Sequence, residues 1–195
     1  MADLTVPLHI VVMGVSGCGK SSVARRIADH LNVPFIEGDD LHSPASIERM
    51  SRGLPLNDDM RWPWLDRIAS ALGERPGGAV ASCSALKRSY RERLAKDCPL
   101  FFLHLDVGRD VLISRMTARE HFMPVSLLEN QLQTLEPLAP EELGVTVLGS
   151  MPFDQLSCKV LSILEAWTDQ LKTSVGNPSH PGASNVSDNA TTDEF

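Results

Sequence analysis

The sequence predicts an α/β domain in which a parallel sheet of about five strands is covered by helices on both faces. Short, continuously apolar segments alternate with amphipathic segments of helical period along residues 8–172. Repeated alternation of this kind is typical of parallel strands joined by right-handed helical crossovers. A length of 195 residues is enough for one such domain with a sizeable core and is short for two.

The elements are expected in alternating order along the chain. The expected strands are Leu8–Met13, Val33–Ile36, Gly78–Cys83, Leu100–Asp106 and Val145–Leu148. The expected helices are Lys20–Leu31, Pro44–Arg52, Pro63–Leu72, Ser89–Lys96, Arg109–Ala118, Val125–Leu135 and Phe153–Lys172. Pro63 suits a first helical turn, so Trp62 and Trp64 are expected to pack in the core at a helix start.

The last segment, Thr173–Phe195, differs from the rest in composition. It is rich in Ser, Asn, Pro, Gly and Thr and holds almost no large apolar side chain. Such a segment buries too little apolar surface to fold, so we expect a domain over 1–172 and a disordered tail over 173–195.

The charged residues indicate which kinds of binding partner the protein can have. The formal net charge is -7, which argues against binding nucleic acid or an anionic membrane through a broad basic surface. Arginine nevertheless outnumbers lysine by 13 to 5, and its planar fork of donors suits phosphate and carboxylate ligands. Three of the seven excess negative charges lie in the tail, so the expected domain is close to -4.

Location is inferred from two further features. The four cysteines are scattered without the paired spacing of a zinc or redox motif, so reduced thiols are expected. No apolar run approaches the roughly 20 residues that span a bilayer, and the first residues lack the pattern of a secretory signal. A cytoplasmic protein is therefore expected.

A phosphate-binding motif follows the first expected strand. Residues 14–21 read Gly-Val-Ser-Gly-Cys-Gly-Lys-Ser and fit the P-loop pattern Gly-x-x-x-x-Gly-Lys-Ser/Thr between a strand and a helix. Backbone N–H groups of such a loop surround phosphates, the lysine reaches the β and γ phosphates, and the serine hydroxyl binds Mg²⁺. We therefore expect ATP and Mg²⁺ as cofactors, with the metal on Ser21. The expected nucleotide-binding residues are Gly14, Ser16, Gly17, Cys18, Gly19, Lys20, Ser21 and Ser22.

Cys18 inside this loop has two interpretations. A thiol beside a helix N-terminus and a lysine could have a lowered pKa and be open to oxidation. Alternatively, Cys18 is a small side chain that fits the loop.

An acidic segment lies where the acceptor of a phosphoryl group is expected to bind. P-loops occur in switches, motors and kinases alike, so the loop alone does not identify the class of protein. A GTPase switch would need an Asn-Lys-x-Asp segment that recognises guanine, and the chain has none. Residues Glu37–His42 follow the second expected strand, at the carboxyl edge where ligands bind in open α/β sheets. Asp39 or Asp40 could orient an acceptor hydroxyl there, or simply form a solvated acidic turn.

Five sequence blocks between Ile10 and Leu164 resemble the gluconate kinases, P-loop relatives of shikimate and nucleoside monophosphate kinases. After the P-loop come a Gly-Asp-x-Leu-His segment, a Leu-Asn-Asp stretch leading into Arg-Trp-Pro-Trp, a Cys-Ser-Ala-Leu-Lys block, an Arg-Glu-His-Phe-Met lid segment, and a Gln-x-x-Thr-Leu-Glu stretch. These lie at Gly38–His42, Gly53–Leu65, Cys83–Lys87, Arg119–Met123 and Gln131–Glu136. Met60 stands where the family usually has an acidic residue, and Met50, Met60 and Met123 are interpreted as packing residues.

The resemblance implies a fold like that of nucleoside monophosphate kinases, a mobile lid near 119–136, and often a homodimer. It implies that Asp39 is the base or orienting group, that Arg119 neutralises charge on the transferring phosphoryl, and that Arg115 stacks on adenine. The residues it places near the sugar acid are Asp39, His42, Arg61, Lys87, Arg91 and His121. Lys87 and Arg91 could equally face solvent.

The expected activity is transfer of phosphate from ATP to the 6-hydroxyl of D-gluconate, which gives ADP and a pentose phosphate pathway intermediate, 6-phosphogluconate. Catalysis of this kind depends mainly on positioning and charge neutralisation. Two alternatives remain open: a kinase for another small hydroxy acid or polyol, and an ATP-binding regulator without catalytic activity.

Overall fold

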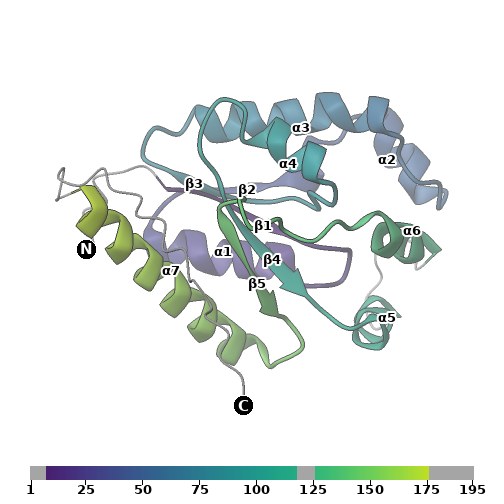
Figure 1. Cartoon of the computed structure of the whole chain (residues 1–195). Coiled ribbons are helices and arrows are strands. Elements are labelled where there is room, and N and C mark those ends of the chain that lie inside the picture. The colour runs from purple at the N-terminus through teal and green to yellow at the C-terminus, as the bar shows by residue number, and fades with distance from the viewer. Residues whose placement is uncertain (1–7, 118–125, 176–195) are drawn as a thin grey trace, which may run out of the picture.

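The computed structural model describes residues 8–117 and 126–175, and its central feature is a parallel sheet with strand order β2-β3-β1-β4-β5 (Figure 1). All four neighbouring pairs of strands run parallel, as the sequence predicts. The strands are β1 (His9–Met13), β2 (Phe35–Glu37), β3 (Ala79–Ser82), β4 (Phe101–Asp106) and β5 (Gly144–Leu148).

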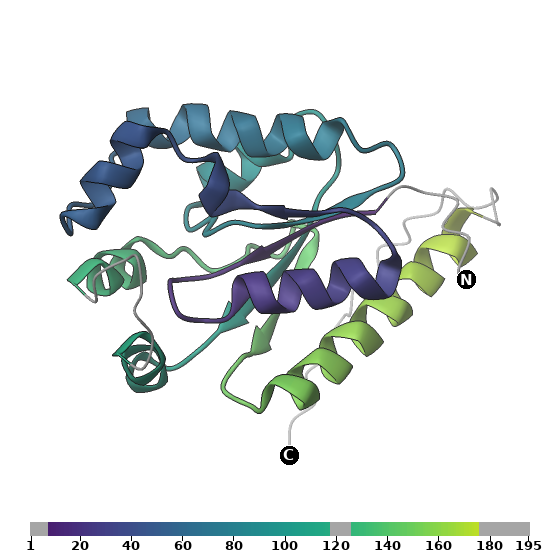
Figure 2. The same cartoon turned by 180° about the vertical axis from the view of Figure 1, so that it is seen from behind.

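Helices cover both faces of this sheet. Helices α1 and α7 lie on one face and α3 and α4 on the other, while α2, α5 and α6 gather beyond one edge of the layers (Figures 1 and 2). The helices are α1 (Lys20–Leu31), α2 (Pro44–Ser51), α3 (Asp58–Gly73), α4 (Arg88–Leu94), α5 (Arg109–Thr117), α6 (Ser126–Thr134) and α7 (Phe153–Val175). The three-layer α/β prediction is confirmed.

The continuous apolar run of β1 is explained by burial on both faces of the sheet. Ile10 and Val12 are fully buried in the core that includes α1 and α7. Val11 and Met13 are fully buried in the core that includes α3 and α4. Because alternate side chains of a strand point to opposite faces, a strand covered on both faces has no polar face to present.

Two predicted helix boundaries were wrong. Helix α3 begins at Asp58, so Pro63 lies inside the helix rather than in its first turn. The Asn57 side chain accepts a hydrogen bond from the Met60 N–H, and two acidic residues follow it in the first turn. This capping and the burial of later α3 side chains offset the roughly 3 kcal/mol that an interior proline costs. Helix α7 continues to Val175, three residues into the expected tail.

Two further observations concern the cysteines and the helices. All four cysteines are free thiols in the structure. Among residues 8–117 and 126–175, no helix combines the length and apolarity needed to cross a membrane.

Candidate active site

The P-loop joins β1 to α1 as its motif predicts. Gly19 is the N-cap of α1 with φ 99°, a left-handed backbone conformation that glycine adopts without steric cost. The Lys20 ammonium donates a hydrogen bond to the Val15 carbonyl at 3.1 Å, so the side chain folds back over its own loop. This geometry places a cation and a helix N-terminus at the same point, which is a suitable receptor for phosphate.

Cys18 packs inside the loop. Its side chain is 1% exposed, and burial raises the pKa of the thiol despite the nearby Lys20 and Arg115. The possibility of a lowered pKa was therefore wrong, and Cys18 acts as a small packing side chain.

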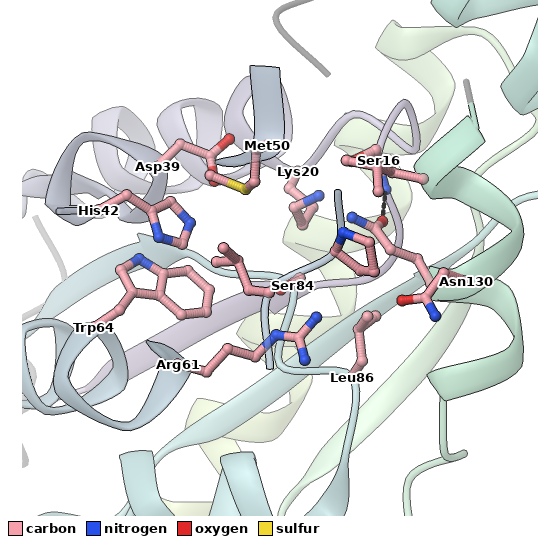
Figure 3. Close-up of a pocket in the computed structure, with 14 residues that line it drawn as sticks. Ser16, Lys20, Asp39, His42, Met50, Arg61, Trp64, Ser84, Leu86 and Asn130 are labelled. Carbon is pink, nitrogen blue, oxygen red and sulfur yellow. Dashed lines mark hydrogen bonds between the residues drawn. The ribbon is translucent and has the colours of Figure 1, made fainter. Parts of the chain in front are cut away.

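An open cavity of about 540 Å³ lies beside the P-loop (Figure 3). Several of its lining residues are polar and come from five separate parts of the chain: the P-loop, the segment after β2, α3, the segment after β3, and α6. The lining residues are Ser16, Lys20, Asp39, His42, Met50, Pro55, Leu56, Arg61, Trp64, Ser84, Leu86, Leu127, Asn130 and Gln131. The sequence-predicted Lys20, Asp39, His42 and Arg61 are thus brought together around one space.

Asp39 is presented by a tight junction between β2 and the short 3-10 helix η1 (Gly38–Leu41). The Gly38 N–H donates to the Ser82 hydroxyl at 3.3 Å, and the Trp64 indole N–H donates to the Gly38 carbonyl at 2.7 Å. A Cβ on Gly38 would lie 2.1 Å from the Ser82 carbonyl oxygen, so only glycine fits. Of the two adjacent carboxylates in η1, Asp39 lines the cavity and Asp40 does not.

His42 forms a neutral, half-buried wall of the cavity. Its ring stacks on Trp64 at a centroid distance of 4.2 Å and an interplanar angle of 14°. Burial lowers the pKa of His42 to about 4, with the nearby Asp39 opposing the shift. Within the described residues, the buried His42 Nδ1 has no hydrogen-bond partner. A neutral imidazole with such a nitrogen can exchange hydrogen bonds with a polyol hydroxyl.

Arg61 reaches the cavity from α3 (Figure 3). Its side chain is 13% exposed, and its Nη1 donates to the Tyr90 hydroxyl at 3.1 Å. A guanidinium in this position can bind a carboxylate with its remaining donors.

Gln131 and Trp64 contribute to this site in ways that the sequence did not predict. Gln131 of α6 accepts a hydrogen bond from the Ser16 backbone N–H through Oε1 at 2.7 Å, which ties α6 to the P-loop. Its block carried the family resemblance, but no local pattern indicated the contact. Trp64 was assigned to packing alone, and it both packs in the core and lines the cavity.

Methionine packing is confirmed for two of the three residues. Met50 is buried with Leu56 and Leu127, and Met60 packs against this cluster. Met123 lies outside the described residues.

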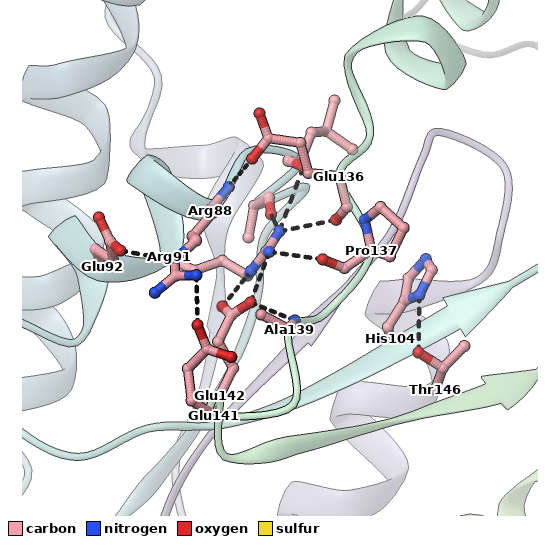
Figure 4. Close-up of polar contacts among 12 residues, drawn as sticks. Arg88, Arg91, Glu92, His104, Glu136, Pro137, Ala139, Glu141, Glu142 and Thr146 are labelled. Atoms are coloured by element: carbon pink, nitrogen blue, oxygen red, sulfur yellow. Dashed lines mark hydrogen bonds and ion pairs between the residues drawn. The ribbon is translucent and has the colours of Figure 1, made fainter.

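Arg91 faces neither substrate nor solvent, which corrects both expectations. It is 1% exposed and forms an ion pair with Glu142, with Nε 2.5 Å from Oε1 (Figure 4). Its Nη2 donates to Glu142 Oε2 at 2.8 Å, and both Nη1 and Nη2 donate to backbone carbonyls. These carbonyls belong to Ala85, Leu86, Glu136 and Pro137. With its donors engaged in this way, Arg91 joins α4 to the segment after α6 and has no access to the cavity.

Lys87 also does not line the cavity. Its ammonium donates to both carboxylate oxygens of Asp58, at 3.0 and 2.9 Å.

The lid and adenine predictions fall partly outside the described residues. Arg115 donates to the Cys18 carbonyl at 3.4 Å and to the Gly149 carbonyl at 3.0 Å, which places its guanidinium beside the P-loop. Arg119 and His121, expected in the lid, lie outside the described residues.

The donor set fits Mg²⁺. Mg²⁺ in phosphoryl-transfer sites is held by one or two side-chain oxygens together with phosphate oxygens and waters. Ser21 is half-buried in the first turn of α1, and Asp39 offers a carboxylate to the adjoining cavity. Within the described residues, no cluster of three or more metal-binding side chains occurs.

Comparisons with known proteins agree with this geometry. A family model described as an AAA domain matches residues 10–138. A gluconokinase from Gluconobacter oxydans (strain 621H) is 49% identical over 148 residues, which make up 73% of this chain and 83% of that protein. The thermosensitive gluconokinase of Escherichia coli (strain K12) is 43% identical over 138 residues, 68% of this chain and 74% of that one.

A solved structure shows the same likeness in three dimensions. The gluconokinase from Sinorhizobium meliloti 1021 is 47% identical, with a TM-score of 0.80 over 86% of this chain and 97% of that chain. The resemblance drawn from the five sequence blocks is confirmed, and the chain belongs to the gluconokinase family of P-loop kinases.

Proposed function

We propose that the protein transfers the γ-phosphoryl group of ATP to the 6-hydroxyl of D-gluconate, giving 6-phosphogluconate and ADP. The observation that carries this proposal is the single cavity lined by Lys20, Asp39, His42 and Arg61. Lys20 can bind phosphate, the Asp39 carboxylate can accept a hydrogen bond from a hydroxyl, and Arg61 can bind a carboxylate. The gluconokinases described above support the choice of substrate.

The P-loop holds the nucleotide in this proposal. Lys20 moves from the Val15 carbonyl to the β and γ phosphates, and the loop N–H groups surround the β phosphate. Arg115 lies against the loop and stacks on the adenine ring. Ser21 and the phosphates would hold Mg²⁺, which would supply positive charge against the charge that develops on the transferring group.

The acceptor lies between Asp39 and Arg61. Asp39 accepts a hydrogen bond from the 6-hydroxyl and takes its proton as the oxygen attacks phosphorus, while the bond to the ADP oxygen breaks. Neutral His42 binds hydroxyls along the chain of the sugar acid, and Arg61 binds its carboxylate. Because both ends are fixed, positioning contributes most of the rate enhancement.

Three further predictions are retained as part of this proposal. Arg119 and His121 act from a lid near 119–136, of which α6 supplies Leu127, Asn130 and Gln131 to the cavity. The protein works in the cytoplasm, where ATP is available. It forms a homodimer, which light scattering on the purified chain tests.

The test is acceptor-stimulated ADP release by the purified protein. The panel contains gluconate, shikimate, glycerate, nucleoside monophosphates and a no-acceptor control. Gluconate is expected to give a turnover of about 1–100 s⁻¹, the usual range for kinases. Stimulation by another acceptor but not by gluconate would support a different small-molecule kinase. ATP binding without stimulation by any acceptor would support the regulator.

A further inference from the structure

Arg61 belongs to a hydrogen-bonded cluster that continues away from the cavity. The Tyr90 hydroxyl accepts from Arg61 Nη1 and donates to Asp58 Oδ1, and Asp58 also accepts from Lys87 through both oxygens. Arg61 Nη1 lies 3.6 Å from the same Asp58 oxygen. The order of contacts is therefore Lys87, Asp58, Tyr90 and Arg61, with only Arg61 lining the cavity.

The cluster holds the Arg61 guanidinium from one side. Tyr90 is 1% exposed, and its ring lies 5.5 Å from Arg61 Cζ and 5.3 Å from Lys87 Nζ. Trp62 packs edge-on against the same ring at 5.4 Å. Among the described residues, the hydrogen bonds and ion pair of Arg61 use only Nη1, so Nε and Nη2 remain available for a ligand.

The charges of the cluster suit a monoanion. Arg61 and Lys87 contribute two positive charges and Asp58 one negative charge, which leaves one positive charge. The hydrogen bond from Tyr90 and those from Lys87 hold the pKa of Asp58 below its usual range, so the carboxylate stays ionised. Asp58 thus offsets one of the two cations rather than standing unpaired beside the anionic ligand.

We propose that Asp58 and Tyr90, backed by Lys87, are positioning residues that fix Arg61 for the carboxylate of the acceptor. This inference rests on the proposed function, because it takes the acceptor to be a sugar acid. It also gives Lys87 a role through Asp58 rather than by contact with substrate. The cluster therefore sets the affinity for the acceptor and leaves nucleotide binding and the chemical step unchanged.

The direction in which Asp58→Ala changes the KM for gluconate distinguishes a positioning role from a purely electrostatic one. Asp58→Ala removes a negative charge near the carboxylate, so electrostatics alone would lower KM for gluconate. If Asp58 instead positions Arg61, the KM for gluconate rises by about tenfold, a loss typical of a hydrogen bond to a charged group. Tyr90→Phe keeps the ring and removes the hydroxyl, so it is expected to raise the same KM, with kcat and KM for ATP unchanged.

Asp59→Ala is the matched control. Asp59 occupies the same first turn of α3 and carries the same charge, but it is exposed and forms no hydrogen bond or ion pair within the described part of the chain. Its variant should match the wild type in every constant. A lowered or unchanged KM for gluconate in both Asp58→Ala and Tyr90→Phe would overturn the positioning role while the function stands. A wild type that does not phosphorylate gluconate would overturn both.

Discussion

At the scale of single residues, the reacting groups differ from close neighbours mainly in where the backbone places them. Asp39 and Asp40 are consecutive, exposed carboxylates in η1, and only Asp39 lines the cavity. Lys20 lies at the start of α1 and lines the same cavity (Figure 3). The pattern Gly-Asp-x-Leu-His indicated this segment, but the choice between the two aspartates needed the family resemblance.

The first prediction tests these two groups. Lys20→Ala removes the cation on the phosphates, and Asp39→Asn removes the proton acceptor. Each is expected to lower kcat with gluconate by about 10²-fold or more while the far-ultraviolet circular dichroism stays that of the wild type. Asp40→Asn is the control and should retain wild-type turnover. Wild-type turnover in Asp39→Asn would remove that residue from the mechanism.

The second prediction concerns the protonation of His42. Because burial lowers its pKa to about 4, the imidazole should stay neutral well below pH 6. An NMR titration of its ring signal, assigned by its loss in His42→Asn, should show a midpoint near pH 4 rather than near the ordinary value of about 6.5. A midpoint near 6.5 would contradict the buried, neutral ring.

The same shift affects stability with a definite sign. Between about pH 6.5 and pH 4 the unfolded chain binds a proton at His42 and the folded chain does not, so falling pH favours unfolding. Above about pH 6.5, His42 is neutral in both the folded and the unfolded chain, so this loss of stability is absent there. Between pH 7 and pH 5, denaturant unfolding of the wild type should therefore lose more free energy than unfolding of His42→Asn.

At the scale of elements, the site depends on how closely β2 approaches β3. Gly38 lies at the point where the chain leaves β2 against Ser82, and Trp64 of α3 binds its carbonyl. The sequence predicted the strand and the turn, but it could not show that the Cβ position is filled by the Ser82 carbonyl oxygen. Such a contact depends on strand pairing, which no local pattern records.

The third prediction follows from this contact. Gly38→Ala would place a Cβ 2.1 Å from the Ser82 carbonyl oxygen, so the backbone must shift. We expect a loss of roughly 3 kcal/mol or more in the free energy of unfolding, measured with urea. Gly73→Ala is the control, because a Cβ at the end of α3 meets no atom within 4 Å. An equal loss in both variants would argue against the tight junction.

The fourth prediction concerns the anchor of α4. Arg91→Met leaves Glu142 without its ion-pair partner and removes one donor from each of four carbonyls, of which that of Leu86 keeps the Glu136 N–H. The free energy of unfolding should therefore fall by about 3–5 kcal/mol. Arg93→Met on the same helix removes an exposed ion pair with Asp66, so its free energy of unfolding should stay close to that of the wild type. If gluconate binding changed while stability did not, Arg91 would instead belong to the substrate site.

At the scale of the whole molecule, the parallel sheet brings distant segments to one place. Strand order β2-β3-β1-β4-β5 sets the P-loop after β1, η1 after β2 and the Cys83–Lys87 block after β3 at the same end of the sheet. The alternation of continuously apolar segments with amphipathic helical segments predicted this architecture. Strands that are buried on both faces are apolar throughout, which a single sequence shows clearly. The alternation could not predict which cations reach the cavity.

The arginine excess illustrates that limit. The sequence placed Lys87 and Arg91 beside Arg61 as possible substrate contacts, but Arg91 is enclosed by carbonyls and Glu142, and Lys87 is paired with Asp58. Arg61 alone of these three lines the cavity. Side-chain pairing across elements decides this outcome, and such pairing depends on the tertiary structure.

The fifth prediction tests the central claim that this cavity directs ATP to the 6-hydroxyl of gluconate. Purified protein is incubated with ATP, Mg²⁺ and gluconate labelled with ¹³C at carbon 6, and the product is followed by ¹³C and ³¹P NMR. The proposed reaction predicts a carbon 6 signal split by phosphorus, formed in step with ADP and absent with Lys20→Ala. An unsplit carbon 6 signal after ADP has formed, or a phosphate ester at another carbon, would contradict the claim.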